Sequence, residues 1–111
     1  MFGSDPTILT IAKSMVSHAT SRQAVLAENI AHADTPGYRA KDVASFAEVF
    51  RGDAPVDAQV DRSASVKPTG NSVHLEDQVM YLAEARGQHE MALAMWEKMS
   101  NFYQLALRGS R

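Results

Sequence analysis

The four histidines of the chain are the side chains best suited to acid–base chemistry or to metal binding. They are His18, His32, His74 and His89. A metal site built on histidine usually has two ligands three to five residues apart, supported by a carboxylate or a third ligand. No pair of these histidines has that spacing. We therefore expect no metal ion and no cofactor.

Nucleophilic catalysis has no support in the sequence either. The chain contains no cysteine, which excludes a disulfide framework, a thiolate zinc site and a cysteine nucleophile. It has no nucleophile elbow, no glycine-rich phosphate loop and no Ser/His/Asp order of a hydrolase, so we expect that it is not an enzyme. Methionine and aromatic residues near the carboxy terminus recur at helical spacing, which favours packing over a cofactor pocket. Those residues are Met91, Met95, Trp96, Met99, Phe102 and Tyr103.

Charge and length exclude further classes of partner. The 111 residues include 11 basic and 13 acidic side chains, and the two signs are interspersed. No basic stripe favours nucleic acid or anionic lipid. The longest apolar run, Met91 to Trp96, is far shorter than the roughly 20 residues that cross a bilayer. A chain of this size buries only about two thirds of its unfolded surface, which favours stability gained from neighbouring copies.

The elements that must position these residues begin with a helix in the first segment, residues 1–34. Asp5 is a good N-cap, Pro6 suits the first helical position, and we expect the helix to stop near Ala33. Apolar residues step by three, four or seven along one stripe: Ile8, Ala12, Met15, Ala19, Leu26, Ile30 and Ala33. A second stripe of small hydroxyl residues lowers helix propensity, so the helix should be marginal alone: Thr7, Thr10, Ser14, Ser17 and Ser21.

The middle segment, residues 35–72, is predicted to be irregular. Pro36 and Gly37 fit the two central positions of a type II turn, which reverses the chain after the first helix. The apolar residues of 46–50 could form one helical turn, and residues 56–60 alternate like a short strand.

The last segment, residues 73–111, predicts a second long helix from about His74 to Arg108, with Gly87 as a weak point or a place of close helix approach. One heptad-like path contains Leu75, Val79, Leu82, His89, Leu93, Trp96, Tyr103 and Leu107. A second path contains Tyr81, Ala85, Ala92, Met95, Met99, Phe102 and Ala106. Two apolar seams exceed what one facing helix covers, so we expect a mainly α coiled-coil hairpin that packs in a multi-helix assembly.

The segment that follows the first helix carries a family resemblance. The run from Leu26 to Tyr38 reads LAENIAHADTPGY and closely resembles the signature of flagellar rod and hook proteins, usually written ANNIANANTPGY. The residues of the family turn motif are Asn29, Ile30, Ala31, Asp34, Thr35, Pro36, Gly37 and Tyr38. Residues 39–43 with Phe46, and residues 70–76, are similar to the proximal-rod branch of that family. The chain departs from the usual pattern at His32, His74 and Gln78.

The resemblance implies a structural subunit of the flagellar basal body that is needed for motility. It implies export through the flagellar type III apparatus without a cleaved signal, and the first residues indeed lack the pattern of a signal peptide. It also implies polymerisation in the periplasm, with further copies, other rod subunits, the export-gate adaptor and the membrane ring as partners. The residues expected at the assembly interface are Ile8, Met15, Leu26, Ile30, Leu75, Val79, Leu82, Leu93, Trp96, Met99, Phe102 and Leu107.

Two other interpretations stay open at the level of sequence. A small helical-hairpin module that binds secretion substrates would also be short, helical and free of cysteine, but it would form a discrete dimer or heterodimer. A membrane-surface amphipathic protein would carry Lys and Arg along a polar face. The first helix has only Lys13 and Arg22 as basic residues, which argues against that second alternative.

Overall fold

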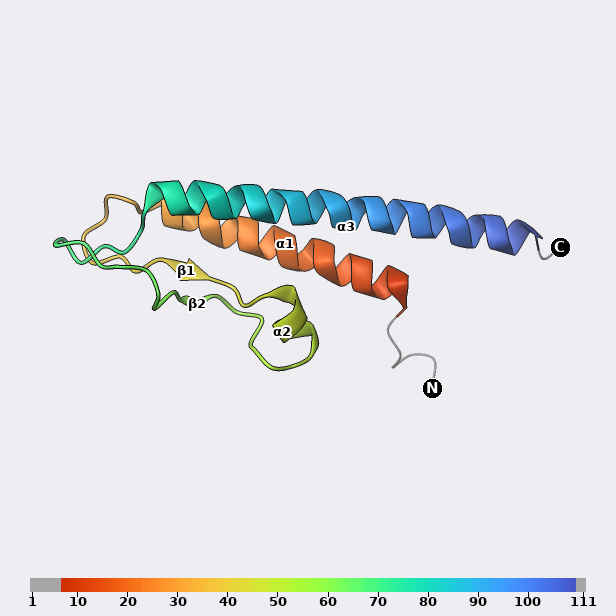
Figure 1. Ribbon diagram of the computed structural model, residues 1–111, viewed down its shortest axis with the longest axis horizontal. Coiled ribbons are helices and arrows are strands. Elements are labelled where there is room, and N and C mark those ends of the chain that lie inside the picture. Colours follow the sequence, from red (N-terminus) through yellow and green to blue (C-terminus); the bar gives the residue numbers. More distant parts are fainter. Residues whose placement is uncertain (1–6, 110–111) are drawn as a thin grey trace.

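Two long helices, α1 (Ile8–Ala31) and α3 (Leu75–Gly109), run antiparallel in the computed structural model, which describes residues 7–109 (Figure 1). The molecule is elongated, with extents of 67 × 26 × 15 Å. The prediction of a mainly α hairpin with an irregular middle segment is confirmed. Within the described residues, no helix is both long enough and apolar enough to span a membrane.

Helix α1 begins with the first residue of its apolar stripe, Ile8, and ends two residues before the predicted stop near Ala33. Thr7 is its N-cap, and the Thr7 hydroxyl accepts a hydrogen bond from the backbone N–H of Thr10 at 3.1 Å. The predicted start at Asp5 and Pro6 lies outside the described residues. His32 is the C-cap, with a φ of −105° that has left the helical range, so Ala33 already belongs to the turn.

The two helices meet along a seam of small side chains. Heptad steps place Ala12, Ala19 and Leu26 of α1 against α3, and all three are buried. Ala85 and Ala92 of α3 are buried in the same way. Alanine lets two helix backbones approach closely but buries little apolar surface for each residue. The hairpin is therefore narrow, and much of its larger apolar side-chain surface lies elsewhere.

Helix α3 is longer than α1 and continues beyond it. Every residue from Asn101 to Gly109 is exposed, and Figure 1 shows this end of α3 projecting past the start of α1. We call residues 101–109 the α3 tip. A helix of this kind has no partner helix within the described chain along its last turns, so the overhang is available for contacts between molecules.

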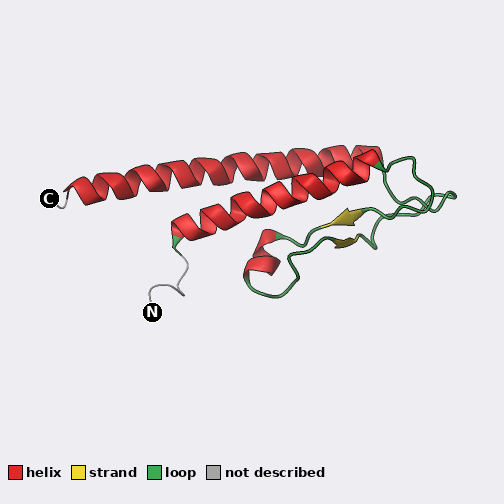
Figure 2. Cartoon of the chain, turned by 180° about the vertical axis from the view of Figure 1, so that it is seen from behind, coloured by secondary structure: helices red, strands yellow, loops and turns green. Residues whose placement is uncertain are grey.

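The middle segment packs along one side of α1 (Figure 2). Strand β1 (Lys41–Asp42) pairs antiparallel with β2 (Gln59–Val60), and helix α2 (Phe46–Phe50) lies between them in the chain. Ser45 is the N-cap of α2: its hydroxyl accepts from the N–H of Glu48 and donates to the Glu48 carboxylate. The predicted helical turn is confirmed. The predicted strand at 56–60 is only partly correct, because residues 56 and 57 form a bend.

Candidate assembly site

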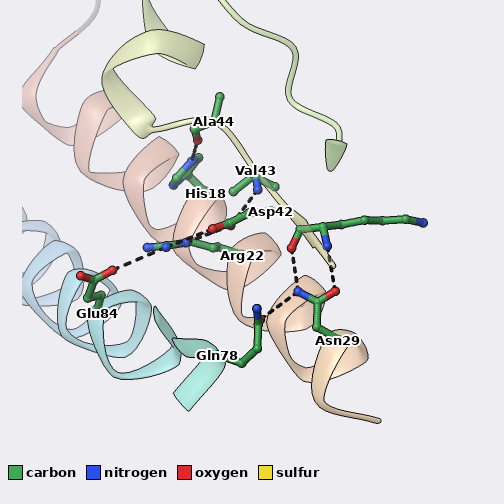
Figure 3. Close-up of polar contacts among 9 residues, drawn as sticks. His18, Arg22, Asn29, Asp42, Val43, Ala44, Gln78 and Glu84 are labelled. Carbon is green, nitrogen blue, oxygen red and sulfur yellow. Dashed lines mark hydrogen bonds and ion pairs between the residues drawn. The ribbon is translucent and has the colours of Figure 1, made fainter. Parts of the chain in front are cut away.

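The side-chain amide of Asn29 joins three separate segments of the fold (Figure 3). Its Nδ2 donates to the backbone carbonyl of Lys41 at 2.7 Å and to Oε1 of Gln78 at 2.9 Å. Its Oδ1 accepts from the backbone N–H of Lys41 at 3.0 Å and from the Tyr38 hydroxyl at 3.4 Å. Asn29 is completely buried. Since each of its donors and acceptors needs a partner there, Asn29 fixes the register of α1 against both β1 and α3.

The Pro36–Gly37 turn has the geometry that the sequence predicts. The backbone N–H of Tyr38 donates to the carbonyl of Thr35 at 3.2 Å, which closes the turn. Gly37 has a φ of +77°, as the third position of a type II turn requires. This conformation suits glycine because a side chain there would meet the backbone.

Asn71 and Ser72 connect this turn to the start of α3. The Nδ2 of Asn71 donates to the carbonyls of His32 and Thr35 at 2.9 and 2.8 Å, so it pairs carbonyls at the end of α1. The Ser72 hydroxyl accepts from the backbone N–H of Ala40 at 2.8 Å. Both residues are buried. These bonds tie together segments more than thirty residues apart.

A close backbone contact adds a second constraint at the same place. The N–H of Gly37 donates to the carbonyl of Thr69 at 3.0 Å. A Cβ placed on Gly70 would lie 3.2 Å from the Cα of Gly37, and Gly70 has a φ of +84°. The absence of a side chain at Gly70 therefore lets the two turns approach this closely.

Arg22 links α1 to β1 and α3 through charge. Its guanidinium donates to both carboxylate oxygens of Asp42, at 3.1 and 3.2 Å, and its Nη2 lies 3.5 Å from a carboxylate oxygen of Glu84 (Figure 3). The guanidinium carbon is 5.6 Å from the centre of the Tyr81 ring. A bidentate, partly buried Arg–carboxylate pair is among the stronger ionic contacts in proteins. Arg22 therefore orients the middle segment on the hairpin.

The histidines lie apart and act as local hydrogen-bonding groups. His18 Nε2 lies 2.7 Å from the carbonyl of Ala44, so this nitrogen must carry the proton that is donated. His74 Nε2 contacts the carbonyl of Ser65 at 2.8 Å in the same sense. The ring of His32 stacks on Tyr38, with centroids 4.5 Å apart. Among residues 7–109, no group of three or more His, Asp or Glu side chains is placed to hold a metal ion.

Two tyrosines in this region have perturbed acidity. Burial raises the pKa of Tyr38 above its ordinary value, and the nearby Glu28 carboxylate raises it further. Burial also raises the pKa of Tyr81, with added repulsion from Asp77, Asp61, Asp42 and Glu84. Both phenols are therefore neutral at physiological pH and can donate hydrogen bonds.

The residues predicted at the assembly interface fall into three groups. Leu26 is buried in the seam, so its surface is used inside the subunit. Four are half-buried at the edges of the hairpin: Met15, Ile30, Leu82 and Met99. The remainder are between 37% and 69% exposed, and they are Ile8, Leu75, Val79, Leu93, Trp96, Phe102 and Leu107. We call the exposed apolar residues of α3 that precede its tip the outward apolar face; they are Leu75, Val79, Leu93 and Trp96.

The residues of the predicted turn motif also divide by role. Asn29 and Tyr38 join the buried hydrogen-bond network, while Thr35, Pro36 and Gly37 build the turn. Ala31 and Asp34 are exposed, and Ile30 is half-buried. Sequence reasoning missed Gln78, Arg22 and Asp42 as structural partners. For Gln78, the sequence did hold a signal. The resembled family commonly has Glu at this position, and a Glu carboxylate can also accept a hydrogen bond from an amide.

Comparison with known proteins adds no relative to this description. No protein-family model matches the chain, and no curated protein matches it.

Proposed function

We propose that this chain is a structural subunit of the bacterial flagellar basal body, of the proximal-rod type represented by FlgB. It would polymerise through its terminal helices and contribute to motility. The observation that carries the proposal is the run from Leu26 to Tyr38, which resembles the rod and hook signature over its whole length. In the fold, the Tyr38 hydroxyl donates a hydrogen bond to the side chain of Asn29, and the turn at Gly37 lies between these two residues in the chain.

The shape and surface of the molecule support an assembly role. The hairpin is narrow, with alanine between its helices and larger apolar residues on its surface. A large exposed apolar patch usually marks a surface that contacts another molecule. Leu75, Val79, Leu93 and Trp96 of α3 are all exposed in this way. Such a helical face is suited to burial against helices of neighbouring subunits.

The proposed setting follows from the same resemblance. The subunit would pass through the flagellar type III apparatus and assemble in the periplasm on the export-gate adaptor and the membrane ring. Its direct neighbours would be copies of itself and other rod subunits. We propose no catalytic activity, cofactor, nucleic-acid partner or membrane span for the chain.

Deleting the gene in its native host and restoring it tests the proposal. We expect a non-motile strain whose basal bodies lack a complete rod, and we expect the wild-type chain to restore both rod and swimming. A deletion strain that swims and builds normal rods would overturn the proposal. A soluble one-to-one complex with an export substrate, together with normal rods, would instead favour a small secretion-associated binding module.

A further inference from the structure

An apolar groove separates α2 from α1. Its volume is about 340 Å³, roughly twice the 150 Å³ of an apolar cavity that accepts a benzene ring. One wall is formed by Phe46, Val49 and Phe50 of α2, together with Val56 after it. Phe50 is 44% exposed and Val56 is 68% exposed. The groove therefore has room for two apolar side chains and presents apolar surface to receive them.

The opposite wall of the groove consists of small residues of α1. Ser14, Ser17 and Ser21 line it at helical spacing. Short side chains on a helix let a second helix approach closely, so this wall can accept a helix and not only a loop. From Ser14 to Ser21 the wall is about 10 Å long, at about 1.5 Å for each residue.

The groove is held open by contacts at one end. His18 donates to the carbonyl of Ala44 at 2.7 Å, and its ring meets the edge of Phe46 with centroids 5.8 Å apart. Phe46 stacks on Phe50 at 5.3 Å. These contacts fix the position of α2 before any partner arrives, which lowers the entropic cost of binding.

The α3 tip has the matching chemistry. Phe102 and Leu105 lie three residues apart, on one side of the helix, and are 59% and 67% exposed. From Phe102 to Gly109 the tip is also about 10 Å long. Two apolar side chains on a short helix correspond to the space that the groove provides.

Charge favours the same pairing. Lys98 and Arg108 flank the apolar side chains of the tip, and residues 98–109 contain no acidic residue. The α2 region carries Glu48, Asp53 and Asp57, and its single Arg51 is already paired with Asp53 at 3.0 Å. Opposite charges at the rim of an apolar contact steer association and fix its orientation.

We propose that the α3 tip of one copy docks in the groove between α1 and α2 of a second copy. The tip cannot enter the groove of its own molecule, because it is the end of a continuous helix that projects past α1 (Figures 1 and 2). The contact is head-to-tail. In a docked pair, one copy therefore still offers its tip and the other copy its groove to a further molecule. Contacts of this kind propagate into open polymers instead of closing as dimers.

The test uses one blocked variant for each surface. Ser17→Trp fills the groove with an indole, while Phe102→Glu with Leu105→Glu places charge on the tip. Thr20→Trp and Gln104→Ala are the controls, because both residues are exposed, Thr20 does not line the groove, and Gln104→Ala leaves the charge of the tip unchanged. Analytical ultracentrifugation gives the association state of each protein, and circular dichroism confirms that all variants keep the wild-type helix content.

We expect wild type and both controls to associate with rising concentration. The groove variant and the tip variant should each associate at least about tenfold more weakly, a difference of one decade in dissociation constant. Mixing the two variants should restore a one-to-one dimer that goes no further, because one intact tip meets one intact groove. This mixed dimer is the specific signature of a head-to-tail contact.

Several results would overturn the contact. They are a wild-type chain that stays monomeric at its solubility limit, variants that associate as wild type does, and a mixture that gives no dimer. A chain lacking residues 1–6 should associate normally, and loss of its association would assign the groove to that segment instead. The inference rests on the proposed role as a polymer subunit. If the Ser17→Trp variant still builds rods, the proposed contact is wrong, but the proposed role as a subunit is not.

Discussion

Asn29 is a residue whose single side chain connects three distant parts of the fold. It contacts β1 and α3 from a fully buried position on α1. Burial of a polar group is tolerated only when its hydrogen bonds are made, and in return it disfavours every shifted register of the hairpin. Arg22, Asn71 and Ser72 add further specific contacts around it.

Replacing Asn29 by Ala should therefore destabilise the fold. The change leaves Gln78 and the backbone of Lys41 without buried partners, at a cost of about 1–3 kcal/mol. Urea unfolding followed by circular dichroism measures the loss. Asn101→Ala, at an exposed position of α3, should change the free energy of unfolding by less than about 0.5 kcal/mol. Equal stability of the two variants would show that the amide network does not hold the hairpin in register.

Gly37 should tolerate substitution only by residues that accept a positive φ. Its φ of +77° makes Gly37→Val strained by about 1–3 kcal/mol, whereas Gly37→Asn should be milder because asparagine enters this region more readily. Thermal unfolding and the rod content of purified basal bodies should both fall in the order wild type, Asn, Val. Indistinguishable Val and Asn variants would mean that the turn geometry is incidental to assembly.

Tyr81 predicts a specific alkaline sensitivity. Burial, and then four neighbouring carboxylates, raise its pKa in the folded protein, so the unfolded chain loses this proton first, near pH 10. Above that pH the unfolded state binds fewer protons, and stability falls as pH rises. Tyr81→Phe should flatten this fall between about pH 9 and pH 11. Parallel stability curves for wild type and variant in this range would contradict the assignment.

At the level of elements, α3 uses its two apolar paths differently. The path with Ala85 and Ala92 faces α1, while Val79, Leu93 and Trp96 lie on exposed surface. Alanine against alanine allows close helix contact, and the exposed side chains of Val79, Leu93 and Trp96 remain available to other molecules. The outward face of α3 is therefore the element on which the proposed assembly depends most.

A charge on this outward face should block assembly more than it destabilises the fold. Trp96 is 38% exposed, so Trp96→Asp should lower the free energy of unfolding by the part that its buried surface contributes, and it should bury an unpaired charge between subunits. Leu82→Asp should block assembly as well, with some loss of stability because Leu82 is half-buried. Thr20→Asp, at an exposed position of α1 outside the groove, is the control for added charge. Export, motility and rod content distinguish the cases, and normal rods in the Trp96→Asp strain would place the interface elsewhere.

The same elements show how far the sequence predicts the fold. Both long helices, the Gly37 turn and α2 follow from local signals, namely heptad steps, proline, glycine and one apolar turn. The pairing of β1 with β2 does not, because two-residue strands carry no alternation to detect. The contacts of Asn71 and Ser72 with residues 32–40 also depend on the path of a long loop, which local spacing does not encode.

The molecule as a whole has specific polar contacts inside the hairpin and exposed apolar side chains on its surface. Amides and an ion pair set the register inside the hairpin, while the outward face of α3, its tip and the groove beside α2 expose apolar side chains. A protein that acted alone would gain nothing from this arrangement. A subunit of a helical polymer needs both features, because each copy must be identical in shape and must offer surface to its neighbours.

The most direct measurement is the composition and structure of intact flagellar basal bodies purified from the native host. We expect quantitative mass spectrometry to find the chain in multiple copies. We also expect cryo-electron microscopy to place antiparallel hairpins with the proportions of α1 and α3 at the base of the rod. Complete rods that contain none of this chain would contradict the central claim.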